Sequence, residues 1–466
     1  MESPSRSTCL LGITDYSIHI PRHSISRAEI AAAWARRPVP GSKAVANFDE
    51  DAITMAQSAA WQLRDSANRL YFASTTSPSL QGSPAALIAA LSDLPRSTVT
   101  ADFAHSLRCG TGALRAALES VEAGRTRSAV VVAADRRDGA PESAEEMSFG
   151  DGAAALAVGA DGVIARLIGI ASISDEFPDE WRRDTDGEVR SAASRFTLER
   201  GYVSNMVAVG RELMREGSIS RAVITSPDRG AHLAVAKTLG ISGQSVADTG
   251  FDEVGVTGAA MPLMLLAGAL DKASPGDRIL LLAHGDGADA FLFEVTAEIA
   301  SLRRPRACLE SRRIAYPTYQ VYRKLREFLR NTDEDELSTV RWDHDETQNV
   351  RLHGAECSQC GTMQFPIPKV CVHCRATGGL VEKPLARTGS LYTFTKDTLY
   401  GGPVQPTVMA VVNLDDGARF LCQMTDVNEQ DVAIGMRVEM VSRRMKGSPS
   451  TNYYYWKCRP VWGDAS

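Results

Sequence analysis

Residues 105–124 read HSLRCGTGALRAALESVEAG and place Cys109 at the start of an Ala-rich helical pattern. Apolar residues recur three and four positions apart through this stretch, which predicts a helix with one buried face. Gly110 and Gly112 allow the backbone to approach another group closely. A cysteine in this position is either a nucleophile, because the helix dipole lowers the thiol pKa and favours the thiolate, or a small buried apolar residue.

The same alternation continues on both sides, from about residue 10 to residue 300. Apolar runs separate Ala-rich helical stretches, and this predicts a layered α/β fold with helices on both faces of a sheet. CGTGALRAAL and GVTGAAMPLMLLAGAL each begin at a glycine turn and precede an apolar run, so we expect an internal duplication. The runs with strand character are AVVVAAD (129–135), AALAVGA (154–160), RAVITSP (221–227) and RILLLAHGDGADAFLFEV (278–295).

Length and composition restrict the class of protein. A chain of 466 residues predicts two or three domains, and 44% hydrophobic with 23% charged residues is typical of a globular protein. The N-terminus lacks signal-peptide features, and the sequence lacks an apolar run of about 18 residues, so we expect a cytoplasmic protein without a membrane partner. The net charge of −6 without a basic block argues against nucleic acid.

The composition changes after residue 300, where short alternating runs replace the α/β pattern. We assign residues 1–300 to the α/β domain, 301–346 to a connector, 347–380 to a zinc ribbon and 381–466 to a small all-β barrel.

Two Cys-x-x-Cys pairs in CSQCGTMQFPIPKVCVHC define the ribbon. Four thiolates from Cys357, Cys360, Cys371 and Cys374 can close a tetrahedral zinc site that leaves no position for substrate, so the metal should be structural. His373 lies inside the second pair and is expected to be a solvated loop residue.

The ribbon followed by GSLYTFT, VVNLDDGARFLCQMTDV and IGMRVEMV resembles the zinc ribbon plus OB-fold domain found beside, or fused to, thiolase-superfamily enzymes. The first three hundred residues resemble the ketoacyl synthase III and hydroxymethylglutaryl-CoA synthase branch of that superfamily. This resemblance implies a duplicated five-layer αβαβα domain. The matching stretches are AVANFDEDAITMA, CGTGALRAALESVEAG, FGDGAAALAVG, VGVTGAAMPLMLLAGAL and PGDRILLLAHGDGADA.

The resemblance implies that Cys109 is the nucleophile and that the loop Gly285, Asp286 and Gly287 lines the oxyanion site. It also exposes departures, because Thr225 occupies the place of the family's catalytic His and Asp228 that of an Asn. In the same comparison, Val256 replaces a second Asn, and YFASTTSP offers no counterpart of the Glu used by hydroxymethylglutaryl-type synthases. We therefore expect His284, with Asp228 as a second candidate, to supply the base.

Three functions remain open from the sequence. The first is an acyltransferase or condensing enzyme that forms an acyl-Cys109 intermediate from an acyl-CoA or acyl carrier protein thioester. The second is retro-Claisen or retro-aldol cleavage of a CoA thioester. The third is a non-catalytic thiolase-like scaffold or acyl-binding subunit. A homodimer is expected from the resemblance.

Overall fold

The computed structural model describes residues 10–183, 186–192, 195–302, 311–330, 339–399, 406–445 and 453–461. Residues 303–310 and 331–338 of the expected connector lie outside the described residues. The chain forms two compact units, of which unit 1 contains Met1–Ala46, Asp51–Ile88 and Ser97–Tyr319, and unit 2 contains Asn47–Glu50, Ala89–Arg96 and Gln320–Ser466.

Unit 1 is built on a sheet with the strand order β11-β12-β13-β8-β1-β7-β6-β4-β5. A short pairing of Gly12 and Ile13 with Arg166 and Ala165 joins β1 to β8 and divides the sheet into two halves. The strands of the first half are β1 (Gly12–His19), β4 (Arg69–Ser74), β5 (Val99–Ala104), β6 (Ser128–Asp135) and β7 (Gly152–Gly159). Those of the second half are β8 (Ala165–Ser174), β11 (Arg221–Ile224), β12 (Arg278–His284) and β13 (Gly287–Val295).

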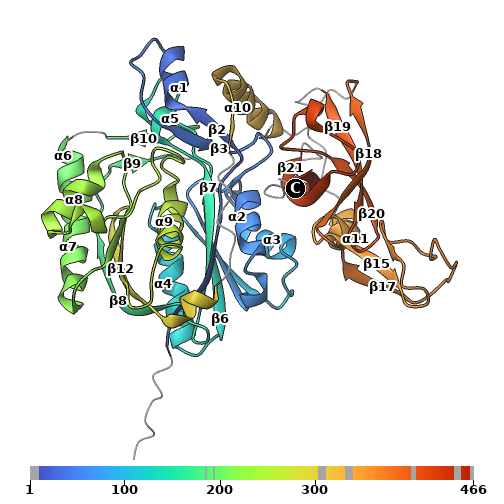
Figure 1. Ribbon diagram of the computed structural model, residues 1–466, viewed down its shortest axis with the longest axis horizontal. Coiled ribbons are helices and arrows are strands. Elements are labelled where there is room, and N and C mark those ends of the chain that lie inside the picture. Colours follow the sequence, from blue (N-terminus) through green and yellow to red (C-terminus); the bar gives the residue numbers. More distant parts are fainter. Residues whose placement is uncertain are drawn as a thin grey trace, which may run out of the picture. The chain divides into compact units, whose positions relative to one another are not determined.

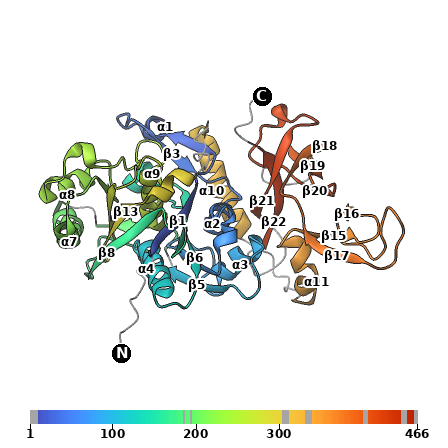
Figure 2. The same ribbon diagram turned by 60° about the horizontal axis from the view of Figure 1, so that its bottom comes forward.

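The helices α4 (Cys109–Glu122) and α9 (Met261–Leu270) lie between the two halves of the sheet in both views (Figure 1, Figure 2). α4 packs against β4, β6 and β7, and α9 packs against β7, β11 and β12. The helices α2 (Ala52–Trp61) and α7 (Ser204–Leu213) cover the outer faces. These five layers confirm the duplicated αβαβα architecture that the sequence predicts.

The central position of α4 and α9 explains their composition. α4 buries Ala113, Leu114, Ala117, Leu118 and Val121, a spacing of three and four residues that gives one apolar face. α9 is buried along nearly its whole length, as an apolar helix between two sheets must be.

Further elements of unit 1 complete its outer surface and its upper edge. The helices are α1 (Arg27–Ala33), α3 (Pro84–Leu91, whose last residues belong to unit 2), α5 (Ala144–Ser148), α6 (Arg195–Thr197) and α8 (Ala231–Leu239). The short strands are β2 (His23–Ser26), β3 (Ser42–Val45), β9 (Glu180–Trp181), β10 (Arg190–Ser191) and β14 (Arg312–Arg313). The connector region contributes α10 (Tyr316–Arg330), whose first residues belong to unit 1 and whose remainder belongs to unit 2, and α11 (Thr339–Asn349), which belongs to unit 2.

Unit 2 contains a five-stranded sheet of order β20-β19-β18-β21-β22 that curls into a nearly closed barrel. The Thr425 N–H donates to the Cys458 carbonyl at 2.9 Å and draws the two outer strands together. This barrel confirms the expected OB-fold domain. Its strands are β18 (Thr388–Asp397), β19 (Thr407–Leu414), β20 (Arg419–Gln423), β21 (Arg437–Met445) and β22 (Tyr453–Pro460), and the ribbon strands are β15 (His353–Cys357), β16 (Met363–Gln364) and β17 (Leu380–Pro384).

The segment Asn47–Glu50 belongs to unit 2 through a buried ion cluster. The Arg443 guanidinium is fully buried and lies 3.4 Å from Asp49, 3.2 Å from Glu50 and 2.7 Å from Asp426. Lys457 adds a second contact to Asp49 at 2.8 Å. Removing one member of such a cluster would leave an uncompensated buried charge, so unit 2 depends on residues far apart in the sequence.

No helix among the described residues is both long and apolar enough to cross a lipid bilayer.

Candidate active site and cysteine cluster

Cys109 is the first residue of α4 and is buried, with 6% of its surface exposed. Its N–H donates to the Ser106 carbonyl at 2.9 Å, which closes the turn before the helix. The following Gly110 packs against the turn that leads into α9, because a Cβ on Gly110 would lie 2.4 Å from the Ala259 carbonyl oxygen. Cys109 therefore sits where the two central helices begin.

Asp135, the last residue of β6, is fully buried beside this point. Its carboxylate accepts six hydrogen bonds, from the Ser74 hydroxyl, the N–H and hydroxyl of Thr75, the N–H and hydroxyl of Thr76, and the Ala259 N–H. The nearby Gly258 has φ +59°, and a Cβ there would lie 2.2 Å from the Asp135 carboxylate. The carboxylate thus ties the end of β4 to the start of α9.

Burial, with the charge of Asp135 as a second cause, raises the pKa of the Cys109 thiol well above its usual value. Hydrogen bonds from backbone groups at the start of α4 and at Ser74 act in the opposite direction and are weaker. This is the reverse of the lowered pKa expected from the helix dipole. The thiol is protonated at neutral pH, so its reaction requires a base.

His284, the last residue of β12, begins the predicted glycine loop. Its imidazole is mostly buried, and burial lowers its pKa to about 4, so the ring is neutral at pH 7. The Nε2 atom lies 3.3 Å from the carboxylate of Asp179, a residue that precedes β9. In the tautomer that carries its proton on Nε2, toward Asp179, Nδ1 would be the atom that accepts a proton.

The loop after His284 packs against the turn that carries Cys109. A Cβ on Gly285 would lie 2.9 Å from the Arg108 backbone nitrogen, and the Arg108 guanidinium donates to the Asp286 carbonyl at 2.9 Å. The Gly285 N–H is engaged with the Gly287 carbonyl at 3.1 Å. The oxyanion role of Gly285, Asp286 and Gly287 stays a prediction.

The residues in the expected His and Asn places have other partners. Thr225 is buried, and its hydroxyl accepts a hydrogen bond from the backbone N–H of His284 at 3.2 Å. Asp228 is exposed, and its Oδ1 accepts from the N–H groups of Gly230 and Ala231 at the start of α8. Val256 is buried, and its N–H donates to the Ser148 carbonyl.

Four charged residues near Cys109 or its neighbours were not among the sequence-based candidates. Two of them are Asp135 and Asp179. The other two are Glu180 and Arg137, whose buried guanidinium contacts the Glu180 carboxylate. The sequence did indicate Asp135, because a carboxylate at the end of the apolar run AVVVAAD is buried with that run and therefore needs hydrogen-bond donors. Asp179 and Glu180 lie in a charged stretch whose sequence resembles that of a solvated surface.

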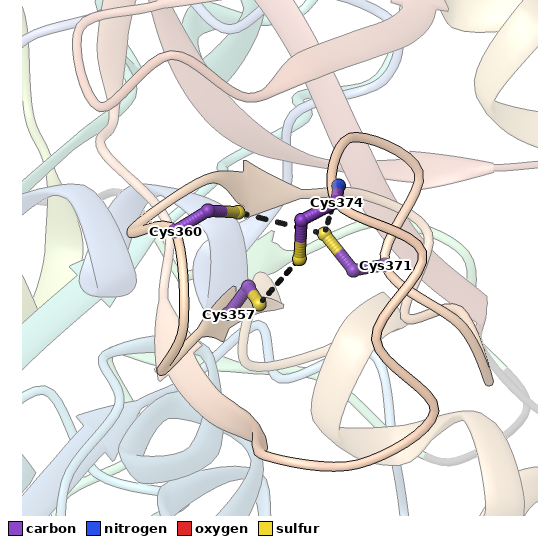
Figure 3. A group of neighbouring side chains, drawn as sticks. All are labelled: Cys357, Cys360, Cys371 and Cys374. Atoms are coloured by element: carbon purple, nitrogen blue, oxygen red, sulfur yellow. Dashed lines mark hydrogen bonds between the residues drawn. The ribbon is translucent and has the colours of Figure 1, made fainter.

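The four ribbon cysteines form a separate cluster in unit 2 (Figure 3). Their sulfur atoms all lie within 4.8 Å of one another, with 3.6 Å between Cys357 and Cys374 and 3.7 Å between Cys360 and Cys371. Tetrahedral zinc with Zn–S bonds of about 2.3 Å separates its sulfur ligands by about 3.8 Å. The cluster therefore suits zinc, and His373 is exposed outside it.

Comparison with known proteins agrees with both parts of the chain. Residues 382–443 match the family described as ChsH2, C-terminal OB-fold domain. Residues 211–293 match the C-terminal part of 3-oxoacyl-[acyl-carrier-protein] synthase III.

Relatives of known name cover the α/β part. The hydroxymethylglutaryl-CoA synthase of Methanopyrus kandleri is 30% identical over 69% of this chain and 98% of its own length. The hydroxymethylglutaryl-CoA synthase of Thermococcus sibiricus is 32% identical over 68% of this chain and 96% of its own length.

Solved structures agree on the fold. MvaS in complex with 3-hydroxy-3-methylglutaryl coenzyme A gives a TM-score of 0.59 at 21% identity, covering 68% of this chain and 92% of that one. The 3-oxoacyl-[acyl-carrier-protein] synthase III of Aquifex aeolicus gives a TM-score of 0.54 at 20% identity, covering 61% of this chain and 99% of that one.

The layered fold, the cysteine at the start of a central helix and the appended OB barrel define a thiolase-like protein of the condensing-enzyme type. Within that class, the chain belongs to the hydroxymethylglutaryl-CoA synthase family.

The raised thiol pKa predicts slow, pH-dependent alkylation of Cys109. Because the pKa is raised, the thiolate fraction at pH 7 is small, and the rate with iodoacetamide should rise about tenfold per pH unit through pH 9. Mass spectrometry of the tryptic peptide Cys109–Arg115 measures the rate, with urea-unfolded protein as the control. A rate that levels off below pH 8 would contradict the raised pKa.

The cysteine cluster predicts one bound zinc ion per chain. Cys371→Ser removes a ligand and should abolish stoichiometric zinc, whereas His373→Ala alters an exposed neighbour and should retain it. Plasma emission spectrometry on both variants measures the metal content. Equal zinc loss in the two variants would exclude the four-cysteine assignment.

Proposed function

We propose that the chain is an acyl-thioester-dependent acyltransferase or condensing enzyme in which Cys109 carries the acyl group. The observation that supports this most directly is the place of Cys109, at the start of a central helix whose preceding turn packs against the glycine loop after His284. The named relatives, which are synthases acting on CoA or carrier-protein substrates, agree with a reaction of this class.

The first step exchanges one thioester for another. The Cys109 sulfur attacks the thioester carbonyl carbon and loses its proton to a base, and the bond from that carbon to the donor sulfur then breaks. The proton passes to the departing thiolate, so the products are acyl-Cys109 and a free donor thiol. The acceptor later attacks the acyl carbon and releases the cysteine. Backbone N–H groups of the Gly285 to Gly287 loop would stabilise the oxyanion in both steps.

His284 is the proposed base. A neutral imidazole whose Nε2 faces Asp179 would accept the thiol proton at Nδ1. Because burial lowers the pKa of this ring to about 4, the imidazolium would be short-lived and would pass its proton to the departing thiolate. His284 thereby replaces the imidazole that Thr225 does not provide. A role for Asp228 as an auxiliary base stays a prediction, and one of its oxygens already caps α8.

The donor is proposed to be a CoA or acyl carrier protein thioester. A related structure, the curacin pathway HMG synthase, was solved with an acetyl donor carrier protein, and another HMG-CoA synthase was solved with CoA. Zinc in the ribbon would be structural, since four sulfur ligands leave no open coordination position. We also expect a homodimer and a cytoplasmic location.

Acyl transfer to Cys109 is tested by intact-mass spectrometry after incubation with a panel of acyl-CoA thioesters. We expect a mass increase equal to one acyl group, and no increase in Cys109→Ala. Thioester turnover that survives this substitution would favour the cleavage reaction. Absence of adducts and of turnover with CoA and carrier-protein donors would favour the non-catalytic scaffold.

The proposed base predicts a kinetic effect without loss of fold. His284→Asn should slow acyl-Cys109 formation about a hundredfold, and Asp179→Asn about tenfold with a changed pH profile, because general-base assistance contributes about 10²–10⁴-fold. Stopped-flow release of free CoA measures the rates, and circular dichroism checks the fold. Unchanged rates in both variants would assign the proton transfer to another group.

A further inference from the structure

Arg137 is a buried arginine of unit 1 that has no role in the proposed acyl transfer. It follows β6 by two residues, and its side chain is 1% exposed. The guanidinium stacks on Phe149 with 3.7 Å from Cζ to the ring centroid, and its backbone N–H donates to Asp151 at 2.8 Å. Both contacts fix the side chain in place.

The hydrogen-bond donors of this guanidinium are incompletely matched. Nη2 donates to the Glu180 carboxylate, whereas Nε and Nη1 are buried and have no hydrogen-bond partner among the described residues. A buried polar group without a partner is costly, and a planar guanidinium fits the two oxygens of a carboxylate better than one. The arrangement therefore offers donors for an additional anionic oxygen pair.

Glu180 lies on the solvent side of this pair. Its side chain is 22% exposed, against 1% for Arg137, so Glu180 is the more exposed member of the pair. Glu180 is held on β9, a strand of two residues that pairs with β10 alone in the second sheet of this unit. Rotation of the Glu180 side chain alone, without movement of β9 or of the neighbouring Asp179, would release the Arg137 guanidinium.

Arg137 lies close to the reacting cysteine through shared neighbours. A Cβ on Gly258 would touch both the Asp135 carboxylate at 2.2 Å and the Arg137 Cδ at 2.9 Å. The charge of Asp135 acts on Cys109 and on Glu180 alike, so one carboxylate lies within interaction range of both. Cys109 and Arg137 therefore both lie near the Asp135 carboxylate.

We propose that Arg137 binds a carboxylate at the far end of the acyl chain, so that the preferred donors are ω-carboxyacyl thioesters. In the free protein the Glu180 carboxylate occupies this position. The inference rests on the proposed function, because it assigns the substrate class of the same site.

The test compares donors of equal chain length with and without the terminal carboxylate. Succinyl-CoA should acylate Cys109 about tenfold faster than butyryl-CoA, and glutaryl-CoA faster than valeryl-CoA, because a charge-assisted hydrogen bond is gained. Arg137→Gln should reduce this ratio to about one, and Arg137→Lys should retain part of it. Glu180→Gln should increase the ratio, because the competing carboxylate is removed.

The matched control is Arg190→Gln, which removes an exposed arginine from β10, the strand paired with β9, and should leave the ratio unchanged. If the ratio is one in the unsubstituted protein, or if Arg137→Gln leaves it unchanged, the proposal is overturned. If Arg137→Gln does not fold, the ratios measured for Arg137→Lys and Glu180→Gln still test the proposal.

A binding measurement separates this proposal from the proposed function. Calorimetry on Cys109→Ala compares the affinities for succinyl-CoA and butyryl-CoA without any acyl transfer. A preference for succinyl-CoA that Arg137→Gln abolishes supports the carboxylate site even if no acyl-enzyme forms. Equal affinities, together with acylation of the unsubstituted protein, would overturn the carboxylate site and leave the acyltransferase intact.

Discussion

The buried carboxylate of Asp135 organises the site. It gathers donors from the end of β4 and from the start of α9, two segments that belong to different halves of the duplicated fold. Six hydrogen bonds compensate for the loss of water around a charge that is otherwise expensive to bury. The end of β4 is thereby fixed against the start of α9, but the same charge opposes ionisation of the Cys109 thiol.

This conflict accounts for the way the rest of the site is built. A protonated thiol needs a proton acceptor, and in the proposed mechanism that acceptor is His284. His284 ends β12, the parallel neighbour of β11, and its backbone N–H donates to the Thr225 hydroxyl just after β11. Its Nε2 atom lies 3.3 Å from the Asp179 carboxylate. The proposed base therefore depends on the strand next to the one where the resemblance places it.

The sequence predicted features that depend on local periodicity or spacing. The run AVVVAAD corresponds to β6, and the two Cys-x-x-Cys pairs form one cluster. Contacts between residues far apart in the sequence could not be predicted from it. An example is the contact between Arg137 and Glu180, which lie 43 positions apart. The sign of the Cys109 pKa shift was also predicted wrongly, because the helix dipole can be inferred locally whereas burial and the charge of Asp135 depend on the folded surroundings.

The membership of Asn47–Glu50 in unit 2 bears on how this chain can be divided. Cutting the gene before the ribbon would separate Arg443 from Asp49 and Glu50, leaving a cation in the barrel interior with part of its counter-charge missing. The barrel therefore needs an acidic segment from the first fifty residues of the chain to neutralise its buried arginine.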